Sequence, residues 1–487
     1  MKRYTIDPIT RLEGHGKIEI FTTDEGEVEN VYFQIPELRG FEKFVEGRAV
    51  EELPQIVTKI CGVCPGCHHM AAGKALDGVF GVEPTLTAKM IRELFYMAHY
   101  VHSHIAHFYA LAAPDFVCGP TAPAAERNVL GVIAKVGKEI GTEVIKQRRI
   151  AQEIQALIGG HQTHVMMNVP GGVRKGIKEE ERKDIVEKAK GFVEFAKFSL
   201  QLFDDVVLKN PAYVDIIVNG PYSLKIHSMG LVDENNKVNF YDGKVRVVNV
   251  DGKELYKYSN TEYRDYVEER VEPWTYLKFP YLKKIGWKGF VEGNDSGVYQ
   301  ATPLARLNAA DGMATPLAQE GYEKMFATLG GKPVHNTLAM HWARLVELMY
   351  SAERCLELAS IPEICNTDLR NKMYQTPKEG IGIVEAQRGT LTHHYMTDER
   401  GIVVKANLIV GTTNNNAPIT MSIKKAAQGV IKKGVEVNDG ILNMVEMAFR
   451  AYDPCFSCAT HSLPGKMPMT VNIRNSEGEI KQTFSRD

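Results

Sequence analysis

The chain has 487 residues, with 58 Lys and Arg against 60 Asp and Glu, which gives a formal net charge of −2. This balance argues against a nucleic-acid or anionic-membrane partner, and the 44% hydrophobic and 24% charged fractions are typical of a soluble globular protein. No run of 18 or more apolar residues predicts a membrane span, and the N-terminus lacks the pattern of a secretory signal.

The N-terminal quarter combines a predicted hairpin with long helices. Residues 17–22 and 28–35 alternate between apolar and polar side chains on either side of a turn. A helix is expected to begin directly after the cysteine cluster at 61–67. From 87 to 112, apolar residues recur at 3.6-residue spacing and predict a long helix that Pro114 ends.

Two further helical patterns follow. One covers 124–157 and is stopped by Gly159 and Gly160, and the other covers about 178–207. Together with the helix at 87–112, they predict a packed bundle.

The second half of the chain is predicted to mix helices and strands. Residues 212–330 are rich in Gly, Asn, Asp and aromatics, which indicates an elaborated αβ insertion with strands at 214–218 and 245–250. After it come predicted helices at 336–359 and 440–450 and predicted strands at 381–386 and 402–410. The expected fold class is therefore α+β, a large mainly helical domain with a central long-helix bundle and peripheral β-hairpins and small sheets.

Two CxxC pairs carry the strongest chemical signal. Cys61 and Cys64 lie near the N-terminus, and Cys455 and Cys458 lie near the C-terminus. A two-residue spacer lets both sulfurs face one ion, and thiolates are soft ligands for zinc, iron–sulfur clusters and other thiophilic metals. The spacing alone fits a structural zinc equally well, so it predicts a four-thiolate site without identifying the metal.

The remaining cysteines are expected to be packed thiols, because free cysteine behaves as a small hydrophobic residue. They are Cys67, Cys118, Cys355 and Cys365.

The residues around both pairs resemble the cysteine motifs of [NiFe]-hydrogenase large subunits. Residues 59–68 read KICGVCPGCH and residues 453–461 read DPCFSCATH, similar to RxCGxCxxxH and DPCxxCxxH. The resemblance extends to RLEGH at 11–15, RGFE at 39–42 and EAQRG at 385–389. Two positions depart from the family pattern, Lys59 in place of arginine and Gln387 in place of proline, and neither removes a metal ligand.

The resemblance implies a nickel–iron centre with carbon monoxide and cyanide on the iron, Ni-Fe(CN)2CO. Carried over, Cys61 and Cys455 would bind nickel alone, and Cys64 and Cys458 would bridge nickel and iron. The implied activity is the reversible heterolytic cleavage of dihydrogen, in which a base removes the proton.

Four further residues match family positions involved in this chemistry. Arg388 would lie above the open metal position, where a guanidinium could polarise dihydrogen or accept its proton. Asp115 and Asp453 would hold this arginine, and Glu13 would relay the proton outward. Considered alone, each has a plainer interpretation: a structural ion pair for Arg388, a turn residue for Asp453, and a surface carboxylate for Glu13.

The resemblance also implies supporting ligands. His68 would donate to a thiolate or to the surroundings of the iron, although a lone histidine is more often a core residue, and Thr412 resembles the hydroxyl residue that binds a cyanide. Glu42 and His461, with the backbone carbonyl of Leu408, match the positions that bind a structural Mg2+, for which a carboxylate is well suited.

The last 26 residues are expected to form a separate segment. The resemblance places the hydrogenase domain at 1–461 and a C-terminal extension at 462–487, which a maturation protease would remove after nickel insertion. The alternative is a tail that stays folded, since residues 469–473 alternate like a strand and a turn follows at 475–478.

The chain lacks further cysteines arranged for iron–sulfur clusters, so its electrons are expected to leave through an iron–sulfur small subunit. The segments around the first pair look most like the cytoplasmic group that includes the F420-non-reducing and cofactor-coupled enzymes. A cytoplasmic location and further heterodisulfide reductase-type or flavin-containing partners are therefore expected.

Three alternatives remain. A respiratory complex I relative would lack the four cysteines as a set. A zinc-stapled structural subunit would explain the sulfurs but not Arg388 or the RLEGH and RGFE segments. A membrane-linked energy-converting hydrogenase would usually end near the second motif, before a tail of this length.

Overall fold

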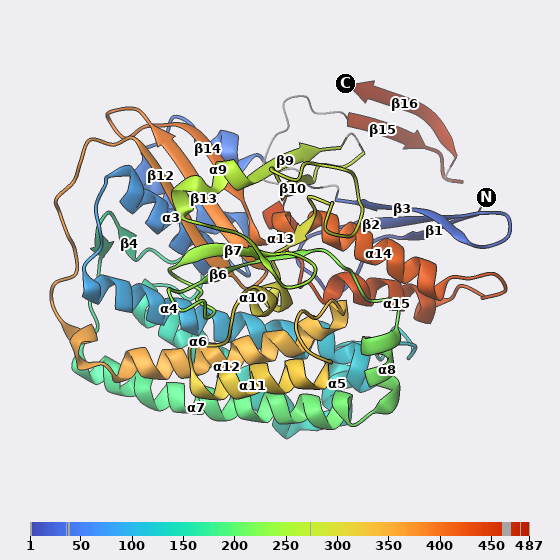
Figure 1. Cartoon of the computed structure of the whole chain (residues 1–487), viewed down its shortest axis with the longest axis horizontal. Coiled ribbons are helices and arrows are strands. Elements are labelled where there is room, and N and C mark those ends of the chain that lie inside the picture. The colour runs from blue at the N-terminus through green and yellow to red at the C-terminus, as the bar shows by residue number, and fades with distance from the viewer. Residues whose placement is uncertain are drawn as a thin grey trace.

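The structure, a computed structural model, describes residues 2–35, 37, 39–272, 274–459, 469–477 and 479–486. Long helices form the lower layer of Figure 1, and small sheets with shorter helices lie above them. One cluster of buried apolar side chains joins residues of the N-terminal strands, the long helices and the helix before the second cysteine pair. The expected α+β class, with long helices and several small sheets, is confirmed.

The helical layer is built from long amphipathic helices. They are α4 (Leu86–Ala106), α6 (Lys138–Gly159), α7 (Glu179–Phe203) and α12 (Met340–Ser360). Helix α12 packs against both α7 and α4, and α4 packs against α6. In α4, the apolar residues Ile91, Leu94 and Phe95 are fully buried, as expected for a stripe that recurs at helical spacing.

The remaining helices are shorter, and most of them pack against the sheets or against the long helices. They are α1 (Phe41–Phe44), α2 (Leu53–Ile56), α3 (Pro65–Val79), α5 (Val129–Val136), α8 (Pro211–Asn219), α9 (Tyr263–Tyr266), α10 (Pro303–Ala309), α11 (Pro316–Thr328), α13 (Gly411–Asn414), α14 (Asn416–Val430), α15 (Asp439–Arg450) and α16 (Phe456–Ala459). Helix α3 begins with Pro65, where the fixed φ of proline suits the helix and its missing N–H costs nothing.

The strands form several small sheets. An antiparallel sheet contains β1 (Lys2–Ile6), β2 (Lys17–Thr22) and β3 (Val28–Gln34) in that order. A four-stranded sheet has the order β11 (Tyr299–Gln300), β6 (His227–Val232), β7 (Lys244–Val248) and β8 (Glu254–Tyr258), with β11 parallel to β6. An antiparallel sheet contains β12 (Glu379–Ala386), β13 (Gly389–Thr397) and β14 (Val403–Ile409). The two-stranded sheets pair β4 (Asn168–Val169) with β5 (Gly172–Val173), β9 (Val267–Val271) with β10 (Lys278–Leu282), and β15 (Met469–Arg474) with β16 (Ile480–Arg486).

Helix α3 and strand β12 lie in direct backbone contact. A Cβ atom at Gly380 would lie 2.0 Å from the carbonyl oxygen of Ala75, and one at Gly382 would lie 2.0 Å from that of Ala71. Only glycine fits at such distances. This contact fixes the start of α3, which follows the first cysteine pair, relative to the hairpin that carries Arg388.

The prediction that Pro114 ends the first long helix is wrong. After α4 the chain continues through two π-helical segments, His107–Ala112 and Pro114–Cys118. Proline clashes with the carbonyl four residues earlier in an α-helix, whereas π-helical bonding reaches five residues back and widens the turn. The helical path therefore continues past Pro114 and places Asp115 in the core.

The prediction of a single helix over 124–157 is also wrong. Helices α5 and α6 are separated at Gly137, whose φ of 95° lies in the left-handed region that interrupts a helix. The predicted stop is confirmed, because α6 ends at Gly159 and Gly160 caps it with a φ of 82°.

The strand predicted at 214–218 is wrong, because these residues lie in α8. The helix is capped by the side chain of Asn210, which accepts from the amide of Ala212, and it begins at Pro211. A short apolar run does not distinguish a strand from a buried helix. Strands β1 and β13 and helix α14 are further elements that the sequence pattern did not predict.

The other predicted elements are present with shifted ends. They are the hairpin β2–β3, the helices α3, α7, α12 and α15, the strands β7, β12 and β14, and the tail hairpin β15–β16. The boundary expected at residue 461 lies outside the described residues.

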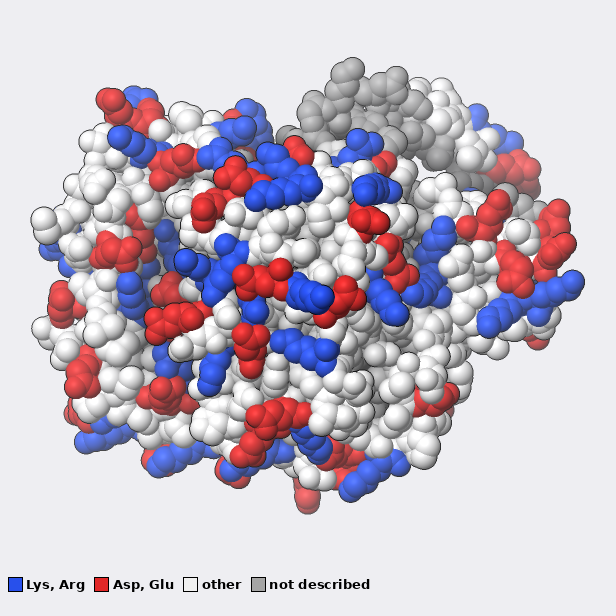
Figure 2. Space-filling model, in the orientation of Figure 1, with Lys and Arg blue, Asp and Glu red and all other residues white. Residues whose placement is uncertain are grey.

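The surface shows mixed charge. On the face drawn in Figure 2, acidic and basic side chains are interspersed rather than gathered into fields of one sign. Among the described residues, no helix combines the length and the apolar composition that crossing a bilayer requires.

Candidate metal centre

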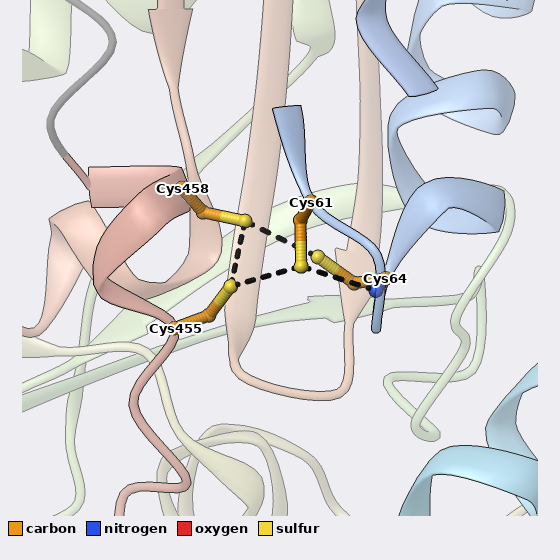
Figure 3. Close-up of side chains that lie close together, drawn as sticks. All are labelled: Cys61, Cys64, Cys455 and Cys458. Atoms are coloured by element: carbon orange, nitrogen blue, oxygen red, sulfur yellow. Dashed lines mark hydrogen bonds between the residues drawn. The ribbon is translucent and has the colours of Figure 1, made fainter. Parts of the chain in front are cut away.

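The fold brings the two cysteine pairs together from opposite ends of the chain. Cys61 follows a short 3₁₀ segment, and Cys64 is the N-cap of α3. Cys455 precedes the short helix α16, and Cys458 lies within it. Figure 3 shows the four side chains pointing toward one another across a small space.

The four sulfur atoms form one compact cluster. The Sγ atoms of Cys61 and Cys455 are 3.2 Å apart, as are those of Cys64 and Cys458, and those of Cys455 and Cys458 are 2.8 Å apart. All four Sγ atoms lie within 4.8 Å of one another, and all four residues are buried. None of these four cysteines forms a disulfide. Sulfurs from both pairs could therefore bind the same metal.

Burial and crowding shift the pKa values of these thiols in opposite directions. Hydrogen bonds from Cys455 and then Cys458 lower the pKa of Cys61 well below its ordinary value. Burial raises the pKa values of Cys455 and Cys458 well above theirs. The cluster alone therefore favours a thiolate at Cys61 and protonated partners. A cation would let all four ionise, and four thiolates suit a thiophilic metal, so the donor set fits a metal centre.

The backbone amides at the start of α3 support a thiolate at Cys61. The amides of Val63 and Cys64 donate to its Sγ at 3.2 and 3.4 Å. Both residues directly precede Pro65, where α3 begins, and the N-terminal end of a helix favours negative charge nearby.

Glu13 reaches the second pair from the N-terminal segment. Its backbone forms a parallel bridge with Cys455, and its carbonyl accepts from the amide of Phe456 at 3.0 Å. The thiol of Cys455 donates to Glu13 Oε2 at 2.9 Å. Burial, followed by the charge of Cys61, raises the pKa of Glu13. A carboxyl group that holds its proton more tightly and touches a sulfur is placed to exchange a proton with it.

His68 and Thr412 also contact the cluster. His68 Nε2 lies 3.5 Å from the Sγ of Cys458, and its Nδ1 lies 3.1 Å from His393 Nε2. The hydroxyl of Thr412 accepts from the amide of Cys455 at 3.0 Å. His68 is thus placed to donate to a thiolate, and Thr412 positions the backbone of a cysteine.

Arg388 and Asp453 form a buried ion pair beside the sulfurs. Nη2 of Arg388 lies 3.0 Å from Asp453 Oδ2, and Nη1 donates to the Ser103 hydroxyl at 3.4 Å. Burial lowers the pKa of Arg388, but Asp453 and the charges of Cys455 and Cys64 outweigh it and raise the pKa above its ordinary value. The guanidinium therefore stays charged next to the cluster.

Asp453 adopts an unusual backbone conformation, with a φ of 53°. Non-glycine residues rarely occupy this left-handed region, and Asp and Asn tolerate it best. The residue therefore joins α15 to the second pair and also supplies the carboxylate for Arg388.

The expectation that Asp115 holds Arg388 is corrected by the structure. Asp115 pairs instead with Arg11 and with Arg450, whose Nη1 lies 3.0 Å from Oδ2. It also accepts from the side-chain amide of Asn443 at 3.0 Å. The widened π-helical turns direct the carboxylate toward the N-terminal segment and α15, so Asp115 ties these elements together rather than holding Arg388.

The residues predicted to bind magnesium are only partly described. Glu42 Oε1 accepts from the amide of Leu408 at 2.7 Å and lies 3.4 Å from Lys278 Nζ. The two residues are therefore neighbours, but this contact uses the amide of Leu408, whereas the predicted magnesium ligand is its carbonyl. His461 lies outside the described residues.

Sequence reasoning missed several residues at the site. Ser103 contacts Arg388, His393 contacts His68, and Gln387 accepts from the Cys67 thiol at 2.9 Å. Ser103 lies within a strong helical pattern, and no local signal distinguished Ser103 or His393 from packing residues. Gln387 stood out only as a departure from the family pattern. Cys67 is buried, as predicted for a packed thiol.

Known protein families match most of the chain. Residues 39–137 and 142–461 match the family described as nickel-dependent hydrogenase, and residues 3–38 match a family described as HoxL-like. The chain is 50% identical over 484 residues to an F420-non-reducing hydrogenase iron-sulfur subunit of Archaeoglobus profundus, and the match covers 99% of each chain.

Two more proteins also match nearly the whole chain. An F420-non-reducing hydrogenase subunit of Methanothermobacter marburgensis is 41% identical over 486 residues, 99% of each chain. The crystal structure of an NAD+-reducing [NiFe]-hydrogenase in the H2-reduced state matches with a TM-score of 0.89 and 36% identity, covering 95% of this chain and 100% of that one.

Proposed function

The chain belongs to the nickel-dependent hydrogenase family as a catalytic large subunit, and from this premise we propose which of its residues carry out the cleavage of dihydrogen. The observation that carries the proposal is the buried cluster of four cysteine sulfurs within 4.8 Å of one another. The zinc-stapled alternative explains this cluster but gives no reason for Arg388 and Glu13 to border it.

The four cysteines would hold the nickel–iron centre. Cys61 and Cys455 would bind nickel alone, and Cys64 and Cys458 would bridge it to an iron that carries carbon monoxide and cyanide. When bound, this centre supplies the site where dihydrogen is polarised and its two electrons are taken up. The chain itself orients the ligands and moves the proton.

Arg388 is proposed to act on the substrate side of the centre. Asp453 holds the guanidinium, and the nearby Cys455 and Cys64 are among the groups whose charges raise its pKa. Such a guanidinium polarises dihydrogen or accepts its proton at a defined position. Asp453 orients the guanidinium and keeps it charged.

Glu13 is proposed to move the proton away from the cluster. Its Oε2 lies 2.9 Å from the Cys455 sulfur and also accepts from the amide of Ser457 at 3.2 Å. These contacts support proton transfer between sulfur and carboxylate, within the distance that general acid–base catalysis needs.

His68 and Thr412 are proposed to support the centre. His68 would donate to the Cys458 thiolate, and Thr412 would bind a cyanide ligand as well as hold the amide of Cys455. Donors of this kind orient metal ligands and tune their basicity. A Mg2+ held by Glu42, the carbonyl of Leu408 and His461 is a further part of the proposal, supported by the proximity of Glu42 and Leu408.

The electrons are proposed to leave through an iron–sulfur small subunit, and onward through heterodisulfide reductase-type or flavin-containing subunits. The four cysteines outside the cluster support this, because among the described residues none of them belongs to a group of three or more possible metal ligands. The relatives are named as subunits of hydrogenases. A cytoplasmic location belongs to the same proposal.

Residues 462–487 are proposed to be an extension that a maturation protease removes after nickel insertion. The match to the hydrogenase family ends at residue 461, which supports a boundary there. The hairpin β15–β16 lies beyond this point.

An infrared spectrum of the natively produced protein, with its co-purifying subunits, tests the proposed centre. Carbon monoxide and cyanide stretches, together with nickel and iron by elemental analysis, are the expected result. A processed chain that ends at residue 461, contains zinc and lacks these bands would overturn the assignment. The matched variant Cys455→Ser should lose the bands, whereas Cys355→Ser, at a buried thiol outside the cluster, should keep them.

A further inference from the structure

The turn that carries Arg388 is held by a second buried arginine. Strands β12 and β13 are joined by Gln387 and Arg388 alone, because Ala386 pairs with Gly389 across the hairpin. Gly389 has a φ of 137°, and a Cβ there would lie 2.2 Å from the carbonyl of Ala301. The turn is tight and closely surrounded, so neighbouring residues determine its backbone conformation. They therefore also determine the position of the Cα atom from which the Arg388 side chain extends.

Arg306 of α10 uses every N–H donor of its guanidinium in this region. A guanidinium has five donors in a rigid fork, and the side chain of Arg306 is fully buried. Two donors bind Glu347 at 2.6 and 2.8 Å, and one binds Glu385 at 2.9 Å. The remaining two bind the carbonyls of Ala386 at 2.8 Å and Gln387 at 3.3 Å, the two residues directly before Arg388.

The acids that orient Arg306 are themselves fixed by the surrounding elements. Glu347 on α12 accepts from His104 Nε2 at 3.0 Å. Glu385 accepts from the amide of Leu231 and the hydroxyl of Thr390, both at 2.8 Å. Both carboxylates are fully buried, and buried charges persist only when they are paired and hydrogen-bonded. The guanidinium therefore has one orientation, set by α4, α12 and the sheets.

A matching contact fixes the turn from its other side. Asn415 donates through Nδ2 to the carbonyl of Arg388 at 2.8 Å and to that of Ala301 at 3.0 Å. The carbonyls of three successive residues, Ala386, Gln387 and Arg388, are therefore all held by side chains from α10 and the start of α14.

We propose that Arg306 is a positioning residue, which clamps the carbonyls before Arg388 and thereby sets the guanidinium of Arg388 beside the four-cysteine cluster. The inference rests on the role proposed above for Arg388. Arginine is required because lysine has one ammonium nitrogen and cannot bridge two carboxylates and two carbonyls in a plane.

Hydrogen–deuterium exchange of the full chain in its metal-free form tests the clamp without using activity. In Arg306→Lys, the amides of residues 387–390 should exchange about tenfold faster, because the local opening of the turn becomes easier. The matched control is Arg92→Lys, which alters a buried arginine that binds Asp77 and the carbonyls of Val169 and Gly172. This control should leave the exchange at 387–390 unchanged. Unchanged exchange in Arg306→Lys would overturn the proposal.

Turnover of the metal-loaded enzyme tests the connection to Arg388. Arg306→Lys should lower kcat about tenfold and Arg388→Lys about a hundredfold, because small displacements of a reacting group are costly. The double variant should be no slower than Arg388→Lys alone, since both changes act through one group. Losses that multiply would show that Arg306 acts independently and would overturn the positioning role.

The two experiments separate this proposal from the one on which it rests. If Arg388→Lys keeps full turnover, the proposed role of Arg388 fails, while the exchange measurement still decides whether Arg306 holds the turn. If Arg306→Lys does not fold, Glu347→Gln replaces it, because this change misorients the guanidinium without removing it. It should give the same faster exchange at 387–390, and unchanged exchange there would count against the clamp.

Discussion

At the scale of single residues, the position of Glu13 depends on pairing between the two ends of the chain. Its side chain contacts Cys455 because its backbone bridges to that residue. Burial raises its pKa, which makes the carboxyl a better proton carrier near neutral pH. Glu13 is therefore partly buried against Cys455, and is not the freely exposed carboxylate that RLEGH alone would allow.

Replacing Glu13 with Gln is expected to slow dihydrogen turnover by about 10²- to 10⁴-fold, because the amide keeps the shape but cannot carry the proton. Infrared bands of the centre should remain, since no metal ligand changes. Hydrogen uptake with an artificial electron acceptor, measured alongside the infrared spectrum, checks both. Glu19→Gln on β2, which removes a partner of Lys17, serves as the control and should keep full turnover. Full turnover in Glu13→Gln would remove Glu13 from the proton path.

At the scale of elements, the π-helical continuation of α4 joins three distant segments through one carboxylate. Asp115 pairs with Arg11 before β2 and with Arg450 at the end of α15. Burial raises the pKa of Asp115, but the Arg450 and Arg11 guanidiniums outweigh it and hold the pKa below its usual range. The ion pairs therefore favour the charged, folded form.

Asp115→Asn should lower the free energy of unfolding by about 3 kcal/mol at pH 7, because it removes the buried carboxylate that both Arg11 and Arg450 pair with. The pKa is depressed in the folded state, so the stabilisation is present above the unfolded pKa of about 4 and is lost as pH falls through the folded value. The difference between variant and parent should therefore shrink below about pH 4.

Urea unfolding of the metal-free chain from pH 7 to pH 3 measures this difference. Asp184→Asn removes a surface carboxylate that pairs with Lys188 and should cost about 1 kcal/mol or less. A gap between Asp115→Asn and its parent that stays constant over the whole range would contradict the ion-pair explanation.

The backbone contact between α3 and β12 is a second feature at the scale of elements that is expected to determine stability. A methyl group at Gly382 would meet the carbonyl of Ala71 at 2.0 Å, so Gly382→Ala must separate the helix from the strand. We expect a loss of about 3 kcal/mol or more, comparable to overpacking a rigid core. Thermal unfolding checks it.

Gly191→Ala in α7 is the matched control for this substitution. Its new methyl group would approach nothing closer than Gln147 at 3.7 Å, and alanine favours a helix interior over glycine by up to about 1 kcal/mol. The control should therefore be neutral or stabilising. A small effect at both positions would show that the backbone contact of α3 and β12 does not limit stability.

At the scale of the whole molecule, the metal centre connects segments that begin and end the chain. Cys61 and Cys455 are 394 residues apart in sequence, yet their sulfurs are 3.2 Å apart. A metal that binds these four sulfurs only in the folded state stabilises that state by mass action. Both ends of the chain should therefore unfold together with loss of the metal.

The metal-loaded protein is expected to unfold at a temperature at least about 5 °C higher than the metal-free chain, by the same linkage. Differential scanning calorimetry of both forms measures it. Cys458→Ser, which removes one of the two cysteines proposed to bridge the metals, should unfold at the temperature of the metal-free chain under either condition. Equal midpoints for loaded and metal-free parent would show that the centre does not tie the two ends together.

Local chemistry made much of the site predictable. The CxxC spacings, a helix close to the first cysteine pair and the amphipathic stripe over 87–112 are short-range features that sequence patterns report directly. The helix begins at Pro65, inside the cysteine cluster, rather than after residue 67 as expected. The family resemblance added Arg388, Glu13 and Asp453, which border the cluster. The sequence also predicted the tail hairpin, since alternation and turn residues determine a hairpin locally.

The sequence by itself therefore determined the donor atoms, the helix periods and the ends of several elements, because these depend on neighbours within one or two turns. The tertiary structure decided which distant groups meet. Asp115 is paired with Arg11 and Arg450, which are 104 and 335 positions away in sequence. Arg306 reaches carbonyls that are 80 and 81 positions away. Such pairings depend on how helices and sheets pack around one core, and a buried charge takes whichever partner that packing brings within reach.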